Sequence, residues 1–139
     1  MVIEILRAHV EEMIGDARAA APAECCGLVG GRGASAVSVY PLRNVAPRAA
    51  VAYEAAPPDL FAAQRLMRER GEHLLAIYHS HPRSEDPRPS ASDVRLAFYP
   101  EAVYFIIGFT RGGEGVLGAF RIYEAEGRWE RAEFRVVED

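Results

Sequence analysis

Two histidines and one aspartate in the middle of the chain are residue types that bind metal ions. His79 and His81 stand two apart in an extended segment, so both rings point to the same side. Asp93 lies twelve residues beyond His81, at the predicted start of a helix. Neutral imidazole and carboxylate are good zinc ligands, and a catalytic zinc ion typically has three protein ligands and one open position for water. The pattern therefore predicts a zinc site, provided that the fold brings the three side chains together.

Each half of this pattern also has a simpler interpretation. A histidine pair at the edge of a loop is often only a solvated polar turn, and Ser90-x-x-Asp93 is close to a capping box, which starts a helix regardless of function. Ser90 fits both interpretations, because a capping serine can also turn its hydroxyl toward a developing oxyanion. From these residues alone both interpretations stay open.

The hydrophobic pattern predicts the elements that must position these residues. An apolar strand that begins at residue 74 turns polar at His79, so the two histidines lie at its C-terminal end, where sites are built in α/β sheets. Other strands are predicted at 2–6, 26–30, 36–42, 103–109, 115–123 and 128–138, with a short extended piece at 51–54. Helices are predicted from residue 10 to before Pro22, from Pro57 to Gly71, and over 90–98. We expect a central mixed sheet with helices packed on its faces, an α/β or α+β layered domain.

Length and composition limit the functional classes. The 139 residues suffice for one domain, 1–139, and leave no room for a second. Cys25 and Cys26 are adjacent, and neighbouring cysteines rarely reach disulfide geometry, so we expect free thiols and a cytoplasmic location. We find no signal peptide and no apolar run long enough for a membrane span.

The charged residues exclude further classes. A formal net charge of −4 argues against nucleic acid as the main partner, because duplex binding normally leaves a basic surface. All 16 basic residues are arginine, so a Schiff-base lysine and a P-loop lysine are both excluded.

The segments around the histidines resemble the signature of the JAMM (MPN+) zinc metalloproteases, which is a distant glutamate, then H-[ST]-H-P, then S-x-x-D. In this chain the signature reads Glu24, His79-Ser80-His81-Pro82 and Ser90-Ala91-Ser92-Asp93. P-x-E-C-C-G-L-V-G at 22–30 and P-L-R-N at 41–44 are similar to stretches of the small stand-alone bacterial members. The resemblance covers residues 22–109 and implies a single MPN/JAB-type domain whose layers resemble those of cytidine deaminases. Deaminase chemistry itself is excluded, because P-C-x-x-C does not occur.

The resemblance also implies roles for individual residues. His79, His81 and Asp93 would bind Zn²⁺, and Glu24 would be the general acid/base that takes a proton from the zinc-bound water and delivers it to the leaving amine. Taken locally, Glu24 would simply be a solvated glutamate beyond a helix. One departure from the family is the eight residues between His81 and Ser90, where seven are usual. Asp86 therefore competes as the third ligand, although Asp93 keeps the S-x-x-D context.

The family cleaves bonds that follow the C-terminal Gly-Gly of ubiquitin or ubiquitin-like proteins. This chain resembles the bacterial branch, so we expect a zinc isopeptidase or peptidase whose partner is a β-grasp sulfur-carrier protein. Two alternatives are a catalytically silent MPN scaffold and a DNA-associated RadC-like protein, which D-P-R-P-S at 86–90 resembles. The retained ligands argue against the first, and the acidic charge and the E-C-C-G context against the second.

Overall fold

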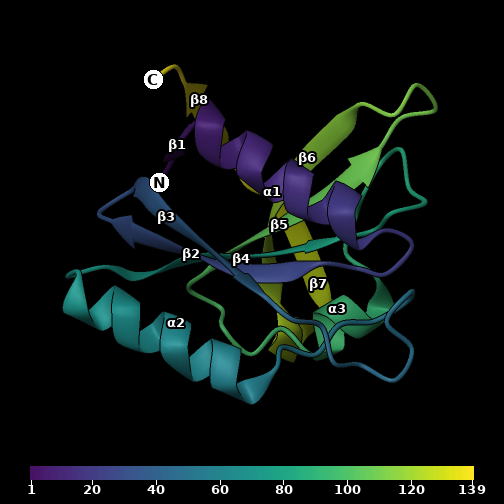
Figure 1. Ribbon diagram of the computed structural model, residues 1–139, viewed down its shortest axis with the longest axis horizontal. Helices are drawn as coiled ribbons and strands as arrows, with labels where there is room; N and C mark the ends of the chain where they lie inside the picture. The colour runs from purple at the N-terminus through teal and green to yellow at the C-terminus, as the bar shows by residue number, and fades with distance from the viewer.

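One eight-stranded mixed sheet runs through the computed structural model, which describes residues 1–139 (Figure 1). The strand order is β7-β6-β5-β4-β2-β3-β1-β8. The strands are β1 (Ile3–Leu6), β2 (Cys26–Arg32), β3 (Ser35–Leu42), β4 (His73–Ser80), β5 (Val103–Phe109), β6 (Gly115–Tyr123), β7 (Arg128–Arg131) and β8 (Phe134–Val137). The helices are α1 (Arg7–Ala20), α2 (Pro57–Glu69) and α3 (Ala91–Arg95), and a 3₁₀ turn, η1, covers Glu124–Glu126.

Strand β4 lies in the interior of this sheet, between β2 and β5. It pairs antiparallel with β2 and parallel with β5, and every residue from Leu75 to Ser80 is buried. A strand covered on both faces needs a continuous apolar run, which explains why LAIY precedes the histidines. The polar end of β4 is therefore anchored on both sides by ladder hydrogen bonds.

The C-terminal segment contributes a strand to each of the two edges of the sheet. Residues 128–138, predicted as one strand, form two strands that lie at opposite ends of the strand order. β7 pairs antiparallel with β6, whereas β8 pairs in parallel with β1. Only Ala132 and Glu133 separate them, so the sheet must curl to bring its two edges near each other.

The two longer helices cover opposite faces of the sheet (Figure 1). Helix α1 buries Val10, Met13 and Ala17, spaced by three and four residues, against one face. Helix α2 begins with Pro57 and Pro58, which suit the first turn of a helix because they need no amide partner there, and buries Ala63 and Met67 against the other face. The predicted mixed sheet with helices on its faces is thereby confirmed.

Two further predicted elements differ from the structure. Helix α3 ends at Arg95, and the continuation to residue 98 is not helical. No strand forms over 51–54, and the isolated bridge nearest to it, Asn44 with Ala55, follows the segment directly. No helix has both the length and the apolar character that a membrane span requires.

Candidate metal centre

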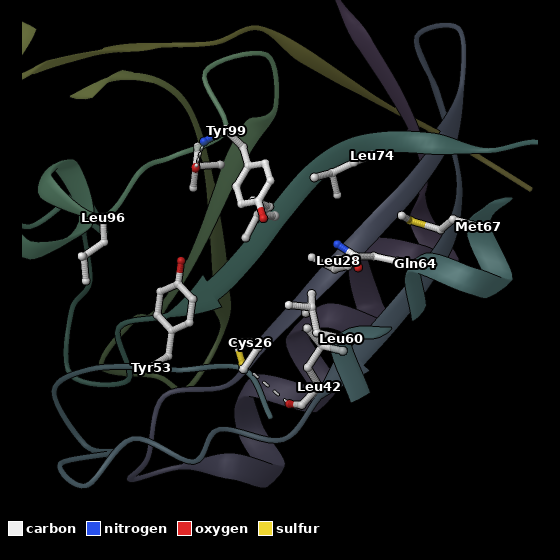
Figure 2. A pocket seen from close by; sticks show the side chains of 14 residues that line it. Cys26, Leu28, Leu42, Tyr53, Leu60, Gln64, Met67, Leu74, Leu96 and Tyr99 are labelled. Atoms are coloured by element: carbon white, nitrogen blue, oxygen red, sulfur yellow. Dashed lines mark hydrogen bonds between the residues drawn. The ribbon is translucent and has the colours of Figure 1, made fainter. Parts of the chain in front are cut away.

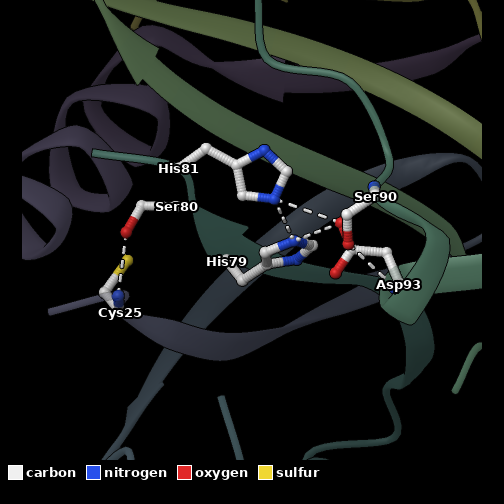
Figure 3. Close-up of polar contacts among 6 residues, drawn as sticks. All are labelled: Cys25, His79, Ser80, His81, Ser90 and Asp93. Atoms are coloured by element: carbon white, nitrogen blue, oxygen red, sulfur yellow. Dashed lines mark hydrogen bonds and ion pairs between the residues drawn. The ribbon is translucent and has the colours of Figure 1, made fainter. Parts of the chain in front are cut away.

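Three potential ligand atoms converge at the C-terminal end of β4 (Figure 3). The Nε2 atoms of His79 and His81 lie 3.2 Å apart, and Asp93 Oδ2 lies 3.2 Å from the first and 3.1 Å from the second. His79 belongs to β4, His81 follows it directly, and Asp93 comes from the first turn of α3. The structure thus brings together the three residues that were predicted as ligands.

The spacing of these atoms suits a tetrahedral ion. Zinc-to-ligand distances of about 2.0 to 2.1 Å place neighbouring ligand atoms about 3.3 Å apart. The three observed separations, 3.1 to 3.2 Å, are close to this value. Two imidazoles and a carboxylate fill three positions, which leaves the fourth for water or substrate. The set is therefore consistent with Zn²⁺.

The charges at the site also favour a cation. Burial alone would raise the pKa of Asp93, but hydrogen bonds from His79 and His81 outweigh it and hold this pKa well below its usual range. Burial would lower the pKa of His81, yet the carboxylates of Asp93 and Glu24 raise it overall. The site therefore carries an ionised carboxylate, which attracts a positive ion.

His79 is oriented by packing and not by a hydrogen bond from its second ring nitrogen. The residue is fully buried, and its Nδ1 has no hydrogen-bond partner in the chain. The ring of Tyr53 stacks on it, with the ring centroids 4.6 Å apart and the planes inclined by 24°. Ligating histidines usually donate their second nitrogen to an oxygen atom, so Tyr53 takes over the orienting role here.

Ser90 forms the predicted capping box. Its Oγ accepts from the Asp93 amide at 3.1 Å, and its own amide donates to Asp93 Oδ2 at 2.8 Å. Ser90 Oγ acts only as an acceptor in this cap, so its O–H remains able to donate. The structural and the catalytic interpretation of Ser90 are therefore compatible.

Glu24 lines the same open groove as His81 and Ser90, together with Val51 and Arg83. It lies between α1 and β2 and is only 7% exposed, so the expectation of a solvated glutamate is wrong. Burial is the main influence and raises the pKa of Glu24 to about 7, with the charge of His81 opposing and that of Asp93 adding. A carboxyl group with this pKa can both accept and donate a proton near neutral pH.

Strand β4 also holds the segment that carries Glu24. Ser80, between the two histidines, accepts a hydrogen bond from the Cys25 amide on its Oγ at 2.8 Å. Tyr78 lies across Gly27 and donates to Asp16 of α1 at 2.8 Å, and a Cβ at Gly27 would overlap the tyrosine ring. The glycine of E-C-C-G thus lets Tyr78 connect β4 to α1 beside Glu24.

The two cysteines are free, as predicted, and both are buried. Burial raises the pKa of the Cys25 thiol and of the Cys26 thiol to about 12. Neither belongs to the metal cluster, so both act as packing residues.

Asp86, the competing third ligand, lies outside the cluster. Its side chain is 62% exposed and forms an ion pair with Arg88 at 2.6 Å. The loop after His81 is held against β5, where Phe109 donates its amide to the Ser84 carbonyl at 2.8 Å. Gly108 permits this approach, since a Cβ there would overlap the same carbonyl.

An apolar cavity lies beside α2, which contributes Leu60, Gln64 and Met67 to its lining (Figure 2). It measures about 180 Å³ and is lined by residues that include Cys26, Leu60, Leu96 and Tyr99. Tyr53 both lines this cavity and stacks on His79, so it separates the cavity from the metal centre. The sequence pattern did not indicate Tyr53, because its contact with His79 spans 26 residues.

Comparison with known proteins supports this arrangement. The family model described as "Prokaryotic homologs of the JAB domain" matches residues 6–123. The chain belongs to this prokaryotic JAB family. The resemblance to small bacterial JAMM proteins that the sequence indicated is thereby confirmed.

Several relatives of this JAB-family chain are enzymes by name. It is 38% identical over 87 residues to a desampylase of Haloferax volcanii, covering 61% of the chain and 62% of that relative. It is 37% identical to a probable TtuB-protein conjugate cleaving protease of Thermus thermophilus (78% of the chain, 71% of the relative). It is 31% identical to a CysO-cysteine peptidase of Mycobacterium tuberculosis (86% and 83%). A protein from Desulfitobacterium hafniense, solved in solution, is 34% identical with a TM-score of 0.85 (99% and 94%).

Proposed function

We propose that this chain is a zinc-dependent peptidase or isopeptidase that hydrolyses the bond after the C-terminal Gly-Gly of a ubiquitin-like sulfur-carrier protein. The observation that carries the proposal is the convergence of His79, His81 and Asp93 beside a buried glutamate. The names of two relatives support the substrate class, since one is a probable TtuB-protein conjugate cleaving protease and the other is a CysO-cysteine peptidase.

In this proposal each residue has a separate task. His79, His81 and Asp93 hold the ion, which when bound lowers the pKa of a coordinated water and polarises the scissile carbonyl. Glu24 accepts a proton at its carboxylate and delivers it to the leaving amine, a task that its pKa of about 7 suits. The Ser90 hydroxyl donates to the oxygen on which negative charge develops.

We also infer that the catalytic unit is one domain, residues 1–139, in the cytoplasm. The continuous sheet, to which segments from both ends of the chain contribute, supports a single unit. The free, buried thiols of Cys25 and Cys26 support a reducing compartment.

Cleavage of a defined carrier tests the function directly. A β-grasp sulfur carrier extended by one cysteine or by a short peptide after Gly-Gly is expected to be cut directly after the second glycine, and a chelator should abolish this cleavage. Changing the last glycine to alanine should make the tail resistant, because an extended Gly-Gly fits a narrow approach to the metal. Mass spectrometry of the products checks the position of the cut. Unselective cleavage of unfolded peptides would contradict the proposal and indicate a general peptidase.

Although it forms no strand in this structure, the 51–54 segment is the expected binding edge for the tail. The amides of Ala52 and Tyr53 have no acceptor in the chain, so a tail could use them as in strand addition. We expect Ala52→Pro to reduce kcat/KM about 10-fold with zinc retained, because proline removes one of these donors. Ala52→Ser keeps the N–H and serves as the control. Full activity of the proline variant would exclude recognition through this edge.

Ser90→Ala is expected to lower kcat about 10²-fold, since the alanine variant cannot donate to the oxyanion. The loss of the cap should also lower stability by about 1 kcal/mol, which thermal unfolding measures separately. Ser92→Ala, a change on the exposed side of the same helix, is the matched control. A less stable Ser90→Ala protein with a normal rate would show that the residue only caps α3.

A further inference from the structure

Asn44, two residues beyond the end of β3, has a side-chain amide that is bonded on both sides. Its Nδ2 donates to the backbone carbonyls of Glu24 at 2.9 Å and Ala52 at 3.0 Å. Its Oδ1 accepts from the amides of Ala46 and Glu54, both at 3.0 Å. Two donors and two lone pairs are thereby used, and a flipped amide would face four groups of like polarity. The side chain is held in one orientation.

Both backbone polar groups of Glu24 are bonded to this region of the chain. The Glu24 carbonyl accepts from Asn44, and the Glu24 amide donates to the Ala49 carbonyl at 2.8 Å. Glu24 lies between α1 and β2, so no helix or ladder fixes it. Its main chain is instead held by Asn44 and by residues 45–54, which we call the 45–54 loop.

The 45–54 loop has few other internal supports. Its backbone bonds join Val45 to Glu54 at 2.8 Å and Val51 to Arg48 at 3.0 Å. The same loop contributes Val51 to the groove that Glu24 lines, and places Tyr53 on His79. Asn44 therefore connects the main chain of Glu24 with the loop that borders the metal centre.

We infer that Asn44 is a positioning residue for the proposed hydrolysis. It holds the Glu24 main chain against the 45–54 loop, so that the carboxyl group is presented to the groove in one place. This inference rests on the proposed function, because Glu24 needs to be positioned only if it transfers a proton. Proton transfer requires the carboxyl group within hydrogen-bond reach of its partner, and small displacements lower the rate.

A double-mutant cycle separates positioning from general support of the fold. Asn44→Ala should lower kcat/KM about 10-fold in the wild-type chain, with zinc retained. In the Glu24→Gln background the same change should cost less than about twofold, because no proton carrier is left to position. Ser38→Ala, which removes a single hydrogen bond to Glu72 far from the groove, is the control and should change neither rate. Equal losses in both backgrounds would overturn the inference.

A second variant tests the bond to Glu24 itself. Asn44→Asp keeps an acceptor for the Ala46 and Glu54 amides but has no donor for the Glu24 and Ala52 carbonyls. We expect it to be at least as impaired as Asn44→Ala. Full activity in Asn44→Asp would overturn the inference, because the donor bond would then be dispensable.

Hydrogen exchange gives a measurement that needs neither metal nor substrate. In the purified chain, Asn44→Ala should raise the exchange rate of the Glu24 amide at least about 10-fold. The 45–54 loop, whose Ala49 carbonyl accepts this amide, would lose its hydrogen bonds to the Asn44 side chain. The neighbouring Cys25 amide, bonded to Ser80 Oγ, should keep its rate. An unchanged Glu24 amide would overturn the inference whatever the substrate is. If no carrier is cleaved but the Glu24 amide responds, the proposed function fails while the contact made by Asn44 stands.

Discussion

The Glu24→Gln variant is expected to keep its fold and its zinc but to lose hydrolysis by about 10²- to 10⁴-fold. Glutamine has the same shape and leaves the three proposed ligands untouched, yet it cannot carry a proton. The effect should be large because Glu24 is buried beside the ligands, and burial raises its pKa to about 7, which suits exchange of a proton with water and with an amine. The measurement is kcat/KM on a carrier extended after Gly-Gly, alongside zinc content.

The matched control is Glu69→Gln, which changes an exposed glutamate on α2 and should leave the rate unchanged. A near-normal rate in Glu24→Gln would mean that another group carries the proton. Loss of zinc together with activity would mean that Glu24 is a ligand. Either result contradicts the assigned role.

The metal centre could be predicted because its pattern is local. The alternation of β4 places His79 and His81 on one side, and S-x-x-D starts a helix that returns a carboxylate to them. The burial of Glu24 was not predictable from its neighbours, since it depends on the 45–54 loop, which is distant in sequence.

The C-terminal strands show that a sequence pattern can predict extended structure without predicting which strands pair. The alternation over 128–138 indicates extended structure but not its partners, so one strand was predicted where two occur. β7 joins β6 by a short hairpin connection, whereas β8 joins β1 from the other end of the chain. Such a long-range pairing depends on how the whole sheet curls, and the local alternation of apolar and polar residues does not predict this curl.

Asn44 and Tyr53 were missed as site residues for the same reason. P-L-R-N contributes only to the family resemblance, and neither asparagine nor tyrosine is among the usual zinc ligands. Asn44 acts through the carbonyl of Glu24, and Tyr53 through the ring of His79. Their contributions arise from tertiary contacts, and a residue's type indicates such contacts only weakly.

A second large effect is expected when Asp93, the proposed third zinc ligand, is removed. Asp93→Ala is expected to lose zinc affinity by more than about 100-fold and activity with it, whereas Asp86→Ala should keep both. Changes to residues that merely orient ligands already cost roughly 10- to 100-fold, and removal of a ligand should cost more. Asp93 Oδ2 lies within 3.2 Å of both ring nitrogens, but Asp86 is exposed and paired with Arg88.

Asp93 also belongs to the capping box of α3, so the alanine variant alone would mix two effects. Asp93→Asn separates them, because its amide oxygen can still accept from the Ser90 amide while the ligating charge is gone. We expect Asp93→Asn to fold with near-normal thermal stability when metal-free and still to retain little zinc after dialysis. Elemental analysis of metal-loaded protein gives the stoichiometry for all three variants. Retained zinc in Asp93→Asn with lost zinc in Asp86→Ala would mean that the longer loop after His81 rearranges on metal binding and supplies the ligand from Asp86.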